Sequence, residues 1–180
     1  KQIEKAFFRE QQYSYEIARK RLLEMGKAGL IKIFKDVTTN RNIYVINYKE
    51  TSKRIKAPTL HTIITLDVLA EMLYNGFTIE EFTTNKEWLG GKVKSDGFVI
   101  FTIKNRRYHF FIETQYGRPD TNLKKYDYLY ESREVQNYLG KNHFPRILLI
   151  DDRQHRNIDV KYTQVVQLDT KLNQFPSILL

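Results

Sequence analysis

Two apolar runs joined by a short basic turn constrain the fold of this chain more than any other feature. They occupy the stretch SDGFVIFTIKNRRYHFFIETQ, residues 95–115. Runs rich in β-branched and aromatic residues with a tight polar connection are typical of an antiparallel hairpin. We therefore expect strands over 96–104 and 107–115, with Asn105 and Arg106 as the turn.

Acidic residues stand at the open end of this predicted hairpin. Asp96 opens the first strand, Glu113 lies near the end of the second, and Gln115 follows two residues later. Pairing 104 with 107 would set Asp96 opposite Gln115 and bring it close to Glu113. Two interpretations stay open: the acids bind a metal, or they are strand-end residues in solvent.

The elements around the hairpin predict a mixed α and β domain. The run PRILLIDD is nearly continuous in apolar residues, as expected for a strand covered on both faces. Apolar spacing elsewhere predicts further helices and strands. The helices are expected over 62–76 and 122–141, and the strands over 77–84, 145–152 and 160–170. The order is αβββαβ followed by one more strand, and the fold class is α+β.

The front of the chain has a different pattern. The stretch SYEIARKRLLEMGKAGLI, residues 14–31, predicts a helix with Ser14 as its N-cap. Its buried stripe is expected to consist of Ala18, Leu22 and Met25. Glycines then end the helix, and Leu30 is expected to return to the core.

A basic hairpin should follow that helix. Ile31, Ile33 and Val37 suit one strand, and Ile43 and Val45 suit its partner, with TTNRN as the turn between them. The polar, basic segment that follows is expected to be a linker. The resulting division is 1–49 for a first domain, 50–61 for the linker and 62–180 for a second domain.

Charge points to a polyanionic partner. The chain carries 30 basic and 21 acidic residues, a formal net charge of +9, and residues 1–50 hold 11 basic and 6 acidic groups. Neutralising phosphates with such groups releases counterions, so double-stranded DNA is the expected partner. The sequence has no cysteine and no run near the ~18 apolar residues of a membrane span. We expect a cytoplasmic protein without a membrane partner.

The run RLLEMGKAGLI resembles the end of the recognition helix in many winged helix-turn-helix DNA-binding domains. An Arg-Leu pair, an apolar residue three positions on and Gly-Leu-Ile lead into the wing. The resemblance covers roughly residues 1–48 and implies that the first helix of that fold lies before residue 1. It also implies which residues bind DNA. On the recognition helix these are Tyr15, Glu16, Arg19 and Lys20, and on the wing Lys35, Arg41 and Asn42.

The order of elements in the second domain, with its two acids, resembles the PD-(D/E)XK nuclease-like superfamily, the restriction-endonuclease-like fold. The resemblance implies that Asp96 and Glu113 hold Mg²⁺ and that Gln115 takes the position of the motif's lysine. Lys125, or its neighbour Lys124, could supply that lysine from the following helix. The alternative is an inactive fold in which Asp96 caps a loop and Glu113 pairs with a basic residue, Arg107 or Lys125.

The combination of the two domains looks like the replication-relaxation family of plasmids and mobile elements. The motifs are DGF, FFIET and LKKYDYLY. The resemblance implies a DNA-binding protein that acts in replication, relaxation or transfer, with a nuclease-like domain that adds phosphate contacts or forms a homodimer. An active Mg²⁺-dependent endonuclease stays open as an alternative, as does a non-enzymatic adaptor or transcriptional regulator that binds protein.

Overall fold

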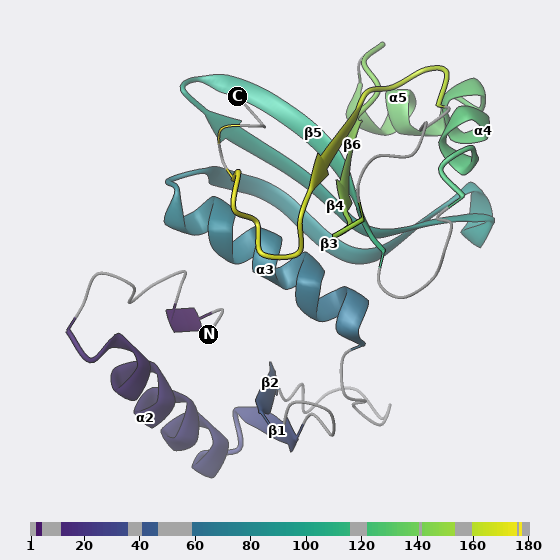
Figure 1. Ribbon diagram of the computed structural model, residues 1–180. Helices are drawn as coiled ribbons and strands as arrows, with labels where there is room; N and C mark the ends of the chain where they lie inside the picture. The colour runs from purple at the N-terminus through teal and green to yellow at the C-terminus, as the bar shows by residue number, and fades with distance from the viewer. Residues whose placement is uncertain are drawn as a thin grey trace. The chain divides into compact units, whose positions relative to one another are not determined.

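The structure is a computed structural model that describes residues 3–4, 12–35, 41–46, 59–115, 122–140, 142–153, 160–175 and 177 (Figure 1). The chain divides into two compact units, Lys1–Leu60 and His61–Leu180. Every helix in the described ranges is too short or too polar to span a bilayer.

The N-terminal unit contains a helix followed by a two-stranded antiparallel sheet. Helix α2 spans Ser14–Lys27, and strands β1 (Ile31–Lys35) and β2 (Asn42–Ile46) pair with each other. Lys35 lies directly opposite Asn42 in the register. This helix and hairpin were expected from the sequence. Val37 and most of the TTNRN turn lie outside the described residues.

Two details of α2 differ from expectation. Ser14 is not the N-cap. That position belongs to Tyr13, at φ 62°, and the Ser14 hydroxyl donates to Glu4 Oε1 instead (3.0 Å). Ala18 and Leu22 are buried as expected, whereas Met25 is 38% exposed and Leu30 55% exposed. The buried stripe ends at Leu22 because the last turn of α2 leads into the turn at Gly29 (φ 72°), and the chain re-enters the core only at Ile31.

The C-terminal unit is built on one five-stranded mixed sheet of order β3-β4-β5-β6-β7. Neighbouring strands are antiparallel from β3 to β5 and parallel from β5 to β7. The strands are β3 (Thr78–Trp88), β4 (Val93–Ile103), β5 (Arg106–Thr114), β6 (Arg146–Ile150) and β7 (Val165–Leu168). The helices are α3 (Leu60–Tyr74), α4 (Lys125–Glu131) and α5 (Glu134–Leu139), with a short 3₁₀ turn at Leu89–Gly91.

Side chains of the central strands alternate between two apolar cores, one on each face of the sheet. Helix α3 covers the first face, where Val68 packs with Val99 and Phe110. Helices α4 and α5 cover the second, where Leu129 packs with residues such as Phe111 (Figure 1). Because successive strand residues point to opposite faces, both sides of β4 and β5 are apolar and the strands read as continuous hydrophobic runs.

The turn of the central hairpin lies one residue earlier than predicted. Lys104 and Asn105, both at positive φ (48° and 60°), form the turn, and Ile103 pairs with Arg106. A two-residue turn with positive φ at both positions matches the right-handed twist of the strands, and asparagine tolerates that conformation. Extended past Gly97 and Ile112, the last recorded pair, this register sets position 96 opposite 113 rather than opposite 115.

The predicted helix over 122–141 is two short helices. Between them Arg133 has φ 62°, which a continuous helix does not allow. Gln136 bridges the break by donating from its side chain to Tyr130 O (3.1 Å).

Candidate functional site

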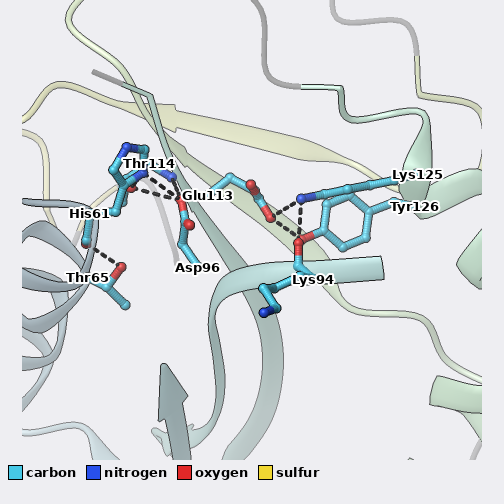
Figure 2. Close-up of polar contacts among 8 residues, drawn as sticks. All are labelled: His61, Thr65, Lys94, Asp96, Glu113, Thr114, Lys125 and Tyr126. Carbon is cyan, nitrogen blue, oxygen red and sulfur yellow. Dashed lines mark hydrogen bonds and ion pairs between the residues drawn. The ribbon is translucent and has the colours of Figure 1, made fainter. Parts of the chain in front are cut away.

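The first half of the candidate site joins the start of α3 to the end of β5 through Asp96. Its Oδ2 accepts hydrogen bonds from the backbone N–H and the hydroxyl of Thr114, both at 2.8 Å, and lies 3.3 Å from His61 Nδ1 (Figure 2). Asp96 follows the buried Ser95 on β4 and precedes Gly97, where the pairing of β4 and β5 ends. Its carboxylate therefore caps the backbone N–H of Thr114, two residues beyond the last β4–β5 pair on β5.

The hydrogen bonds of Thr114 favour a donor role for His61 Nδ1. The Thr114 hydroxyl gives its proton to Asp96, so at 2.8 Å from His61 Nδ1 it acts as an acceptor. Nδ1 then carries a hydrogen. The His61 side chain is 46% exposed and that of Asp96 24% exposed, so this half of the site reaches solvent.

The second half of the site is buried and centres on Glu113. Its side chain is only 4% exposed, and Oε1 accepts from Lys125 Nζ (2.8 Å) and from the Tyr126 hydroxyl (2.5 Å). Lys125 also donates to the backbone oxygen of Lys94 on β4 (2.6 Å). The short first turn of α4 therefore supplies both donors, and the ring of Tyr126 packs on Phe111 with centroids 4.5 Å apart.

Burial dominates the electrostatics of this half. Desolvation raises the pKa of Glu113, while the Lys125 ammonium and the Tyr126 hydroxyl act in the opposite direction. The negative charge of Asp96 makes a smaller contribution in the same direction as burial, raising the pKa of Glu113 further. Burial also raises the pKa of Tyr126 well above its ordinary value, so its hydroxyl remains a donor.

Figure 2 shows the two carboxylates turned toward different partners, Asp96 toward Thr114 and His61, and Glu113 toward Lys125 and Tyr126. Each carboxylate uses one oxygen atom. Asp96 Oδ1 and Glu113 Oε2 have no hydrogen-bond or ion-pair partner in the described part of the chain.

The donor set suits a magnesium ion better than a metal held wholly by protein. Within the ranges that the structure describes, no group of three or more His, Asp or Glu residues could hold a metal. Mg²⁺, however, is commonly bound through one or two carboxylates, with water and substrate oxygens completing its octahedral shell. Asp96 Oδ1 and Glu113 Oε2 are oxygen donors of that kind, so these two residues would hold the ion.

The predicted site residues fall into two groups. Asp96, Glu113 and Lys125 gather at one end of β4 and β5. Gln115 is the first residue after β5, and its backbone N–H donates to Ile150 O (2.8 Å), continuing the pairing of β5 with β6. Its predicted catalytic role stays a prediction. Two basic residues were proposed as partners of Glu113. Lys125 makes this contact, whereas Arg107 donates to Glu80 (2.7 Å).

The predicted DNA-binding residues lie on the surface of the N-terminal unit. All seven are exposed, Tyr15, Glu16, Arg19 and Lys20 on α2 and Lys35, Arg41 and Asn42 on the hairpin. Arg19 and Glu16 lie 3.8 Å apart and more than half of each side chain is exposed, so this ion pair is weak.

The sequence interpretation missed three members of the site. Thr114 lies between Glu113 and Gln115, which were both predicted to be site residues. The run of polar residues at the end of an apolar strand could have indicated that Thr114 belongs to the site. His61 stood outside the predicted helix over 62–76, whereas it lies in the first turn of α3, where its backbone oxygen accepts from Thr65 Oγ1 (2.9 Å). Tyr126 is fully buried, and no local sequence pattern indicates the hydrogen bond that its hydroxyl donates to Glu113.

Comparison with known proteins adds no family assignment. No protein-family model matches the chain, and neither the curated proteins nor the solved structures contain a match.

Proposed function

We propose that this protein binds duplex DNA through its N-terminal unit, with α2 as the recognition helix and the β1–β2 hairpin as the wing of a winged helix. The observation that carries the proposal is the outer face of α2. Ala18 and Leu22 are buried while Tyr15, Arg19 and Lys20 are exposed. The major groove admits a helix, and arginine and lysine there contact guanine or phosphate.

The C-terminal unit supports a role for the protein in DNA handling. The order α3-β3-β4-β5-α4-α5-β6 is compatible with the αβββαβ core of the nuclease-like fold. We place the protein in replication, relaxation or transfer of a plasmid or mobile element, on the resemblance of its DGF, FFIET and LKKYDYLY motifs. The sheet unit then adds phosphate contacts or forms a homodimer, and is non-catalytic.

Fluorescence anisotropy with a labelled duplex tests the proposal. Binding should weaken steeply between about 50 and 200 mM salt, with a slope of about 0.9 in log K per log salt for each neutralised phosphate. The double variant Arg19→Ala/Lys20→Ala should weaken binding to every duplex and lower that slope by about one for each phosphate contact removed.

The matched control is Lys171→Ala, which removes an exposed positive charge from the C-terminal unit. It should bind like the wild type. Absence of duplex binding at low salt would remove the proposal and favour the protein-binding adaptor or regulator. Equal losses in the two variants would show that α2 is not the recognition element.

A second candidate function is an Mg²⁺-dependent DNA endonuclease. The specific observation in its favour is that Asp96, Glu113 and Lys125 gather at one end of β4 and β5. Asp96 and Glu113 would hold the ion, which would stabilise negative charge on the scissile phosphate. Lys125 would contribute its ammonium beside the same phosphate.

Plasmid nicking in Mg²⁺ tests this second candidate. Nicking by the wild type should be lost in Asp96→Ala and in Glu113→Ala. Nicking that survives both substitutions would reject the assignment, as would a wild type that binds DNA and leaves supercoiled plasmid intact.

A further inference from the structure

The Glu113 carboxylate binds a positive charge, and that charge is the ammonium group of Lys125 in the same chain. A carboxylate with a 4% exposed side chain is costly to ionise unless a positive charge lies beside it. The Lys125 ammonium supplies that charge at 2.8 Å. Its second bond, to Lys94 O at 2.6 Å, holds the ammonium between β4 and β5 and fixes its position.

The neighbouring carboxylate makes the same place suitable for a divalent ion. Asp96 stands opposite position 113 when the β4–β5 register is extended by one pair, and each acid keeps one oxygen without a partner among the residues described. Two such oxygens are what Mg²⁺ or Mn²⁺ needs from a protein. A lysine charge and a divalent ion on the same carboxylate repel each other, so they compete for it.

We propose that Lys125 is a tethered cation that occupies the Glu113 carboxylate and excludes divalent metal ions from the Asp96–Glu113 site. Tyr126 and Lys94 hold this closed arrangement, one by its hydroxyl on Glu113 and the other by its carbonyl on Lys125. The wild type then binds Mg²⁺ and Mn²⁺ weakly. Withdrawal of the ammonium from Glu113 opens the site to a metal ion, and the Mg²⁺-dependent endonuclease named above as a second candidate would require that withdrawal.

Metal binding without DNA tests the proposal directly. Mn²⁺ is the probe, because the electron paramagnetic resonance of the free ion reports its concentration. The first variant is Lys125→Met, which keeps much of the length of the side chain. The second is Lys125→Gln, which keeps a hydrogen-bond donor to Glu113 and serves if the first variant fails to fold. Each should bind Mn²⁺ at least about tenfold more tightly than the wild type, a change of about 1.4 kcal/mol.

Two further variants make the result specific. Lys124→Met removes the same charge from the adjacent, exposed position and should bind Mn²⁺ as the wild type does. Lys125→Met/Glu113→Gln removes the carboxylate as well and should lose the added affinity. Mn²⁺ should also raise the unfolding temperature of Lys125→Met, as any ligand of the native state does, and leave that of the wild type nearly unchanged.

Three results would overturn the inference. The first is tight Mn²⁺ binding by the wild type that Glu113→Gln abolishes. The second is equal Mn²⁺ affinity in the wild type and in a folded Lys125 variant. The third is an Mn²⁺ affinity of the double variant equal to that of Lys125→Met. The measurement contains no nucleic acid, so its failure is distinguishable from a failure of duplex binding by the N-terminal unit.

Discussion

At the scale of single residues, the backbone beside the candidate site leaves no room for a side chain at Gly97. A Cβ there would lie 2.6 Å from Thr65 Cγ2 on α3 and 3.2 Å from Ile112 Cβ on β5. Gly97→Ala should therefore force α3 away from the sheet and lower the free energy of unfolding by about 1–3 kcal/mol. The fluorescence of Trp88, the only tryptophan and a buried one, reports unfolding of this unit.

Thr65→Ser provides the matched partner for that substitution. Serine keeps the hydroxyl that donates to His61 O and removes the methyl group nearest to Gly97. In the double variant the cost of Gly97→Ala should fall by at least about 0.5 kcal/mol, the coupling expected of residues in contact. If the free-energy costs of the two substitutions are additive, the added methyl group of Gly97→Ala is strained against Ile112 instead.

Glu113 gives the site a pH dependence of unusual sign. Because burial raises its pKa in the folded state, its contribution to stability is fully present below the unfolded value and is lost as pH rises through the folded value. In metal-free urea titrations from about pH 4 to about pH 7, Glu113→Gln should gain stability relative to the wild type as pH rises. A relative loss would show that Lys125 and Tyr126 outweigh burial.

At the scale of elements, substitutions in the β4–β5 turn can raise the stability of the C-terminal unit. Lys104 and Asn105 both have positive φ, a conformation that suits asparagine at the first position and glycine at the second. Lys104→Asn/Asn105→Gly should stabilise the C-terminal unit by about 0.5–2 kcal/mol in urea unfolding followed by Trp88 fluorescence. Destabilisation would contradict a turn with positive φ at both of these positions.

The same turn shows what sequence alone could and could not predict. The apolar runs of β4 and β5 and the helical spacing of Ile64, Val68 and Met72 predicted those elements correctly. Both Lys104-Asn105 and Asn105-Arg106 are acceptable turn pairs, so the residue types of the turn alone do not decide between the two registers. The break at Arg133 has no glycine or proline to signal it.

The site divides in a similar way. Polar residues inside apolar strands pointed to Asp96 and Glu113, because a buried carboxylate requires a partner. The partners come from distant segments: His61 lies 35 residues before Asp96, and Tyr126 lies 13 residues after Glu113. The packing of α3 and α4 on opposite faces of the sheet determines these contacts, and no local pattern encodes it.

At the scale of the whole molecule, the C-terminal unit should fold without the N-terminal one. Its sheet is covered on both faces by its own helices and carries two apolar cores. A chain of residues 59–180, about 120 residues, has the usual size of a domain. Its Trp88 fluorescence should show one cooperative transition in urea, at a midpoint close to that of the same transition in the full chain.

The same fragment separates the two proposed activities. If α2 and the β1–β2 hairpin carry the DNA contacts, residues 59–180 should lose the salt-dependent duplex binding of the full chain, as Arg19→Ala/Lys20→Ala does in part. Its Lys125→Met form should still bind Mn²⁺, because Asp96, Glu113 and Lys125 all lie in this unit. Full duplex affinity in the folded fragment would show that the C-terminal unit makes the DNA contacts. A fragment that fails to fold would show that the two units depend on each other for stability.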